Sequence, residues 1–167
     1  MTGRRAVFPG SFDPLTIAHL GIVDAVHDQF DVDTVHLALS YEALAKEGKA
    51  AMPVHDRAEA ARSLRGRRPW LAVVTTEAQL LVDIAEGYDL LVVGADKWHQ
   101  LHDPQFYGDS IARRDDAIGR LPELVVVPRA EIELPSTHVQ QLLDVPESIR
   151  HVSSSGVRAG RSDWRAD

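Results

Sequence analysis

The stretch RAVFPGSFDPLTIAHLGIV, Arg5 to Val23, runs from a short apolar segment through a cluster of turn-forming residues into a helical pattern. Ala6 to Phe8 is typical of a strand, and from His19 to Phe30 apolar residues recur three and four positions apart, as in an amphipathic helix. When a parallel strand leads into a helix, the junction lies at the carboxyl end of the strand, where unpaired helix N–H groups attract anions. The stretch therefore predicts a βα unit with an anion site at its turn.

The rest of the chain repeats this alternation of strand and helix. Further short apolar runs are found at Thr34–Leu39, Leu71–Thr75, Leu90–Val93 and Leu124–Val127, and helical spacing is found at Val54–Leu64, Thr76–Gly87 and Asp109–Leu121. The runs LLVV and LVVV are apolar without alternation, which is typical of parallel strands covered by helices on both faces. We therefore predict a Rossmann-like, doubly wound α/β fold with a parallel sheet of about five strands, in one domain over residues 1–167. The polar residues 159–167 are expected to fray.

Composition excludes several classes of function. The chain has 167 residues, of which 44% are hydrophobic and 26% charged, and its formal net charge is -7. A broad nucleic-acid-binding face needs a basic surplus, so we expect no nucleic-acid partner. The absence of cysteine excludes disulfides, thiolate nucleophiles and Cys-ligated zinc. No apolar run approaches a membrane span and no signal-peptide pattern precedes the first strand, so we expect a cytoplasmic protein without a membrane partner.

The turn itself carries candidate binding groups. Gly10 lets the backbone approach a ligand, and the hydroxyls of Ser11 and Thr16 and the ring of His19 lie near the start of the expected helix. On these residues alone, a helix cap at Thr16 and a surface histidine at His19 are the more common interpretation. A second cluster, His99 and His102, has the spacing of a zinc-binding pair. No third ligand is evident for it, so we expect no metal site there.

Two motifs at opposite ends of the chain resemble the signatures of the HIGH-type nucleotidyltransferases. The sequence GSFDPLTIAHL, Gly10 to Leu20, resembles the family loop G-(S/T)-F-D-P followed by (T/H)-x-G-H, with Thr16 and His19 at the first and last positions of the second part. Ala18 stands where the family usually has glycine. The sequence VSSSGVR, Val152 to Arg158, resembles the family's C-terminal signature I-S-S-(T/S)-x-(I/V)-R.

This resemblance implies transfer of a nucleotidyl group from ATP, or less often CTP, to a phosphate-bearing acceptor, with release of pyrophosphate. It implies Mg²⁺ held by phosphate oxygens and water, and a homo-oligomer, because family members often assemble. It gives catalytic contacts to Thr16, His19 and Arg158. It implies nucleotide binding by Gly10, Ser11, Phe12, Gly94, Ser153 and Ser154, and acceptor binding by Asp13 and one of Lys46 and Lys49. From its chemistry and its place at a strand end, Asp96 is expected to bind the nucleotide by accepting from ribose hydroxyls or an amide, with a helix N-cap as the alternative. The Trp98 ring could stack on a base or on the pyridine ring of the acceptor, with a partly buried anchor as the alternative.

The acceptor is less clearly indicated than the reaction. Gly94 to Lys97, in LLVVGADKWHQL, resembles the G-A-D segment of nicotinate or nicotinamide mononucleotide adenylyltransferases. TIAH and SSSGVR look more like phosphopantetheine adenylyltransferases, whose R-G-x-R run is absent here. The sequence favours nicotinate or nicotinamide mononucleotide. The alternatives are phosphopantetheine, another phosphorylated metabolite, and a regulatory module that binds a nucleotide without turnover.

Overall fold

The fold is built on one five-stranded parallel sheet in a computed structural model that describes residues 3–41, 52–135 and 141–166. The strand order is β3-β2-β1-β4-β5, and every pairing is parallel. The strands are β1 (Arg5–Gly10), β2 (Thr34–Ser40), β3 (Leu71–Thr76), β4 (Leu90–Gly94) and β5 (Glu123–Val127). All five coincide with the predicted apolar runs, so the predicted Rossmann-like sheet is confirmed.

The direction of the chain across the sheet reverses beside β1. From β1 the chain passes to β2 and β3 on one side, and then returns to β4 and β5 on the other side. β1 and β4 pair at Ala6–Leu90 and Val7–Leu91, so the reversal lies between these two strands. In such sheets ligands bind beyond the carboxyl ends of the strands at the reversal point. The fold therefore places a crevice next to Gly10 and Gly94, the last residues of the two strands.

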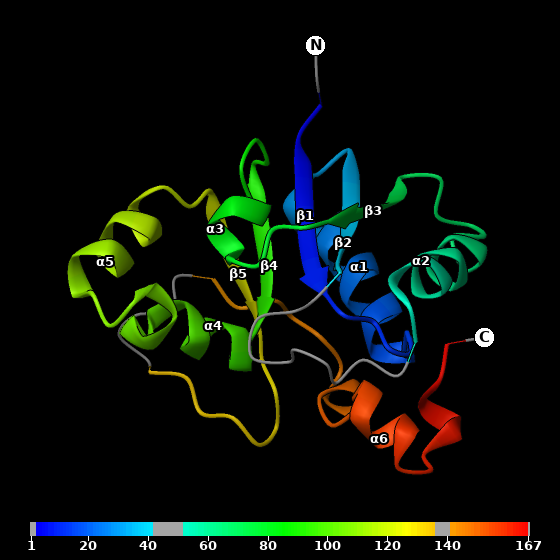
Figure 1. The fold of residues 1–167 in the computed structure, drawn as a ribbon. Helices are drawn as coiled ribbons and strands as arrows, with labels where there is room; N and C mark the ends of the chain where they lie inside the picture. Colours follow the sequence, from blue (N-terminus) through cyan, green and yellow to red (C-terminus); the bar gives the residue numbers. More distant parts are fainter. Residues whose placement is uncertain (1–2, 42–51, 136–140, 167) are drawn as a thin grey trace.

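Six α-helices and three short 3₁₀ turns are found among the described residues. The helices are α1 (Ile17–Phe30), α2 (Val54–Ser63), α3 (Leu81–Ile84), α4 (Ala95–His102), α5 (Ile111–Gly119) and α6 (Ser154–Arg158). The 3₁₀ turns are η1 (Pro104–Tyr107), η2 (Glu147–Ile149) and η3 (Ser162–Trp164). None of these helices has the length and apolar character needed to cross a lipid bilayer. In Figure 1, α6 lies beyond the arrowhead of β1, at the crevice end of the sheet.

Two helical elements differ from the prediction. The helix expected over Thr76–Gly87 is only the single turn α3, because Thr76 still pairs with Ser40 as the last residue of β3. The Thr76 hydroxyl then accepts a hydrogen bond from the Ala78 N–H at 3.1 Å, which turns the chain before a helix begins. The helix α4, in contrast, was not predicted from apolar spacing. It begins directly after β4, so its first turn lies at the crevice.

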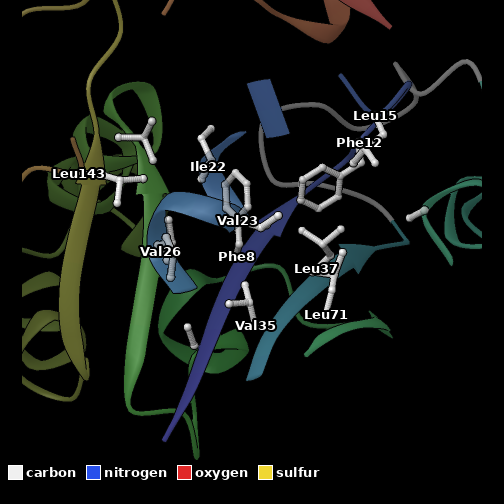
Figure 2. Close-up of a cluster of buried hydrophobic side chains, with 14 of the residues drawn as sticks. Phe8, Phe12, Leu15, Ile22, Val23, Val26, Val35, Leu37, Leu71 and Leu143 are labelled. Carbon is white, nitrogen blue, oxygen red and sulfur yellow. The ribbon is translucent and has the colours of Figure 1, made fainter. Parts of the chain in front are cut away.

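Helices cover both faces of the sheet, and β4 contributes to both apolar layers. Leu90 and Val92 lie in the larger buried cluster, whereas Leu91 and Val93 lie in the cluster on the other face. This two-sided burial explains why the strand is apolar without alternation. Figure 2 shows the larger cluster, in which side chains of β1 and β2 meet those of α1, among them Phe8, Val35, Leu37, Ile22, Val23 and Val26.

The described part of the C-terminal residues that were expected to fray is held against the rest of the molecule. Arg165 forms an antiparallel bridge with Thr16, and the Ala166 N–H donates to the Leu15 carbonyl at 3.1 Å. Ala166 is 6% exposed and belongs to the larger buried cluster. The polar composition gave no sign of this because the contacts are made by a backbone N–H, the alanine side chain and one aromatic ring, Trp164, which lies against Gly156. We call residues 161–166 the tail segment.

Candidate active site

A cavity of about 920 Å³ opens at the carboxyl ends of the central strands. Its walls come from the end of β1 and the turn after it, the starts of α1 and α4, the loop after β5, and residues 145–158. Among the described residues, five cationic side chains line it against three carboxylates: Arg57, Lys97, Arg129, Arg150 and Arg158 against Asp13, Asp96 and Glu131. The cavity of this acidic protein therefore has a local excess of positive charge, which suits a phosphate-bearing ligand.

The turn after β1 forms one wall of the cavity, and we call residues 10–16 the motif loop. Phe12 has a φ of 48° and is 3% exposed, and its ring folds back over Gly10. A Cβ at position 10 would lie 2.8 Å from that ring, so only glycine fits there. The ring of Phe12 also meets the His19 ring edge-on, with centroids 4.9 Å apart. Phe12, expected to bind nucleotide, thus also supports the ring of His19.

The ring of His19 is held by the residue that caps its helix. The Thr16 hydroxyl accepts a hydrogen bond from the His19 backbone N–H at 3.4 Å, while the Thr16 N–H donates to His19 Nδ1 at 2.9 Å. The Thr16 Oγ1 also lies 3.0 Å from Nδ1. A backbone N–H can only donate, so Nδ1 must be unprotonated, and the neutral ring carries its proton on Nε2. This capping box makes Nε2 a hydrogen-bond donor on the cavity wall.

Thr16 has a different place from the one expected for it. It is 0% exposed and is not among the described residues that line the cavity, whereas His19 is. The structure therefore puts the Thr16 side chain behind His19, as the cap of α1 and the holder of the imidazole. A direct contact between its hydroxyl and a triphosphate would need the loop to open.

The second motif meets the first across the cavity mouth. Ser153 caps α6 by accepting a hydrogen bond from the Gly156 N–H at 3.1 Å. The Ser154 hydroxyl donates to the Pro14 carbonyl at 2.6 Å, and Arg158 Nη1 donates to the Asp13 carbonyl. Ser153, Ser154 and Arg158 all line the cavity. Two motifs about 140 residues apart in sequence are thus joined by side chain-to-backbone bonds.

Arg57 is a cavity residue that the sequence analysis missed. It is 2% exposed, and its guanidinium donates to three carbonyls: Nε to Met52 at 3.0 Å, Nη1 to Ser11 at 2.6 Å and Nη2 to Ser40 at 3.3 Å. Burial lowers the pKa of Arg57, and the charge of Asp13 opposes this by raising it. The group remains a cation because arginine starts from so high a pKa. One signal was available, since Arg57 falls on the helical face of the buried Ala58 and Ala61.

Of the two residues after β4 that were predicted to bind ligand, Asp96 lines the cavity and Trp98 does not. The Asp96 side chain folds back toward Gly94, where an added Cβ would lie 2.8 Å from Asp96 Oδ1, and both residues line the cavity. Trp98, expected to contact the acceptor, is 5% exposed and packs in the second buried cluster with Leu101. The helical turn of α4 points Trp98 into the core, so the structure does not bring it to the cavity. Lys97 lines the cavity and donates to Gln100 Oε1 at 2.9 Å.

The other residues expected to bind ligand lie partly at the cavity and partly outside the described residues. Gly10, Ser11 and Asp13 line the cavity, and the Asp13 side chain is buried at 2% exposure. Ala18 also lines the cavity; it stands where the HIGH-type nucleotidyltransferase motif usually has glycine. Lys46 and Lys49 lie outside the described residues. His99 and His102 each bind a backbone carbonyl, of Glu133 and Trp98, at 2.8 Å, and the described part of the chain holds no group of three metal-ligating side chains.

Comparisons with known proteins agree with this architecture. Probable nicotinate-nucleotide adenylyltransferases of Treponema pallidum, one of them from the Nichols strain, are 32% identical to the chain over 74 residues. That match covers 44% of this chain and only 36% of each relative. Two structures of Plasmodium falciparum nicotinic acid mononucleotide adenylyltransferase, complexed with NaAD and with APC, superpose with TM-scores of 0.65 and 0.67 at 12% identity. Each superposition covers 95% of this chain and 83% of the other, and at this identity it shows a shared fold.

A family match is broader than these pairwise ones. The family described as Cytidylyltransferase-like matches residues 7–160, a range that contains the motif loop, the cavity walls and α6. From the length of this match, the chain belongs to the cytidylyltransferase-like family.

Proposed function

We propose that this protein is a nucleotidyltransferase that transfers AMP from ATP to nicotinate mononucleotide or nicotinamide mononucleotide and releases pyrophosphate. The observation that carries this proposal is the joined pair of motifs. The Arg158 and Ser154 side chains bind the motif loop beside His19, in a cavity with excess positive charge. The names of the Treponema pallidum and Plasmodium falciparum proteins support the choice of acceptor.

The reaction needs positioning and charge stabilisation more than proton transfer. An oxygen of the acceptor phosphate attacks the α-phosphorus of ATP, and the bond from that phosphorus to the bridging oxygen breaks, so pyrophosphate leaves with the bonding electrons. The acceptor phosphate is largely ionised at neutral pH, so no strong general base is required. His19 donates from Nε2 to an oxygen of the α-phosphate, where negative charge develops in the transition state.

The other cavity residues hold the two substrates. Arg158 and the hydroxyl of Ser153 bind the leaving pyrophosphate. Gly10 and Ser11 let the nucleotide approach the motif-loop backbone, and the Asp96 carboxylate accepts a hydrogen bond from a ribose hydroxyl. Mg²⁺ would bind the triphosphate through phosphate oxygens and water, and it would neutralise part of the triphosphate charge.

Pyrophosphate release tests the proposal directly. Purified protein would be given ATP and Mg²⁺ with nicotinate mononucleotide, nicotinamide mononucleotide or phosphopantetheine in separate reactions, and CTP would replace ATP in a parallel series. Turnover with either mononucleotide is the expected result. Turnover with phosphopantetheine alone would show that phosphopantetheine, and not a mononucleotide, is the acceptor. ATP binding without turnover in any reaction would favour a nucleotide-binding regulatory module.

Matched variants identify the residues that act. His19→Ala is expected to lower kcat/KM by about a hundredfold or more, because it removes a donor to the transferring phosphoryl group. The control is His27→Ala, on the same helix about two turns further on and outside the cavity lining. Full activity of His19→Ala would contradict the proposed role.

A further inference from the structure

The tail segment contacts both motifs of the candidate active site. Its backbone pairs with the motif loop through the antiparallel Arg165–Thr16 bridge, in which the Ala166 N–H donates to the Leu15 carbonyl. Its Trp164 ring covers Gly156 in α6, where an added Cβ would lie 2.4 Å from the ring. In Figure 1 the end of the chain runs beside α6 and the start of α1. One short segment therefore braces two walls of the cavity.

The tail segment reaches His19 through a single intermediate residue. Thr16, which is bridged to Arg165, donates its N–H to His19 Nδ1 at 2.9 Å. The carbonyl that receives the Ala166 N–H belongs to Leu15, the residue before Thr16. The direction of the Thr16 N–H is set by the peptide plane that it shares with this carbonyl. A bond that fixes the Leu15 carbonyl therefore also fixes the donor that orients the imidazole.

The Trp164 contact is itself held in place within the tail segment. The Arg161 guanidinium lies over the Trp164 ring, 4.1 Å from its centroid, and forms an ion pair with Asp163 at 3.0 Å. The backbone N–H of Arg161 donates to the Gly156 carbonyl at 2.9 Å. Trp164 therefore presses on α6 close to Ser153, whose hydroxyl caps the Gly156 N–H.

We propose that the tail segment is a positioning strap that sets the orientation of His19 through the Leu15–Thr16 peptide, with Ala166 and Trp164 as positioning residues. None of residues 161–166 lines the cavity. The effect of the strap on turnover rests on the proposed nucleotidyl transfer, whereas its effect on the His19 ring does not. The two can therefore fail separately.

The test removes one hydrogen bond from the strap. Ala166→Pro deletes the N–H that binds the Leu15 carbonyl, and Arg165 already has the extended backbone that precedes a proline. The matched control is Arg165→Ala, which changes an exposed side chain and leaves the backbone bond from the Ala166 N–H to the Leu15 carbonyl in place. Circular dichroism and thermal unfolding would show that each variant is folded at the temperature of measurement.

The first readout is the protonation of the His19 ring, measured by ¹⁵N NMR of histidine-labelled protein and assigned with a His19→Gln variant. In the wild type and in Arg165→Ala, we expect the proton on Nε2 and Nδ1 as acceptor. In Ala166→Pro we expect a changed ring signal that shows both tautomers. This measurement needs no turnover. It therefore tests whether the tail segment orients His19 even if no acceptor supports a reaction.

The second readout is kinetic and applies once an acceptor is known. Ala166→Pro is expected to lower kcat by about tenfold and to leave the KM for ATP nearly unchanged, because a misplaced group costs rate rather than ground-state binding. An unchanged His19 signal in folded Ala166→Pro would overturn the proposal. If Ala166→Pro does not fold, Trp164→Ala is judged by the same ring signal, and Trp164→Phe is expected to restore it.

Discussion

At the scale of single residues, the cavity is held together by side chains that donate to backbone carbonyls. Arg57 binds the carbonyls of Ser11, Ser40 and Met52, and Ser154 and Arg158 bind those of Pro14 and Asp13. Such bonds fix the path of loops that have no regular secondary structure of their own. Their acceptors are present at every position of any chain, so no sequence motif identifies them. This explains why Arg57 escaped the sequence analysis although its helix was predicted correctly.

Loss of the Arg57 bonds should destabilise the whole protein. Arg57→Met is expected to lower the free energy of unfolding by about 2–4 kcal/mol, because three carbonyls lose their donor in a buried site. Urea unfolding measures this change. Arg62→Met, at an exposed position of the same helix, is the control and should stay within about 0.5 kcal/mol of the wild type. Equal stability of the two variants would show that the Arg57 bonds are weak.

At the scale of elements, α6 depends on its neighbours because it is too short to be stable alone. It has only five residues. It is held in place by the Ser153 cap, by the contacts to the motif loop and by the Trp164 ring that packs on Gly156. The glycine matters here because of space. A Cβ at position 156 would lie 2.4 Å from the Trp164 ring, which leaves no room for a side chain unless the ring moves.

Filling the space at Gly156 should separate α6 from the tail segment. Gly156→Ala is expected to cost about 1–3 kcal/mol, since the Trp164 ring must move. The double variant Gly156→Ala/Trp164→Ala should lose less than the sum of the two single changes, because both act on one contact. Gly119→Ala is the control in α5, where the added methyl meets open space and should stabilise the helix by up to about 1 kcal/mol. Thermal unfolding measures all four variants. If the effects of Gly156→Ala and Trp164→Ala were strictly additive in the double variant, the contact between these two residues would be contradicted.

At the scale of the whole molecule, charge is distributed unevenly. The protein carries a formal net charge of -7, yet five cationic side chains line the cavity against three carboxylates among the described residues. Repulsion by the acidic surface and attraction by the cavity act on the same anionic ligand. Because the cavity is partly enclosed, its charges are screened by salt less than those at the surface.

Binding of ATP should therefore stabilise the protein through its phosphates. At about 100 times the dissociation constant, a ligand adds about 2.7 kcal/mol to the free energy of unfolding, which raises the Tm of a protein of this size by several degrees. We expect this rise with ATP and Mg²⁺, a smaller one with adenosine, and a reduced one for Arg158→Ala. Differential scanning fluorimetry measures the shifts. Equal shifts with ATP and adenosine would show that the cationic lining does not recognise phosphate.

Much of the fold and part of the candidate site could be predicted from the sequence. All five strands were predicted from their apolar runs, and Gly10, Ser11, His19, Asp96 and Arg158 line one cavity as the motifs led us to expect. Trp98 was assigned to the acceptor from its chemistry, but the helical turn of α4 buries it. Thr16 was assigned a ligand contact, but the tight closure of the motif loop puts it behind the ring that it holds. The direction of a side chain depends on the packing around it, which a motif does not describe.

The sequence by itself determined the order and type of most elements, because apolar spacing records which faces are buried, and it determined the two motifs with their chemistry. Only the tertiary structure decided that these motifs, about 140 residues apart, bind each other, that Arg57 binds carbonyls of three separate segments, and that the tail segment is docked rather than frayed. Each of these contacts is made to a backbone group. Every residue offers the same backbone donors and acceptors, so which of them meet depends on how the chain folds in space.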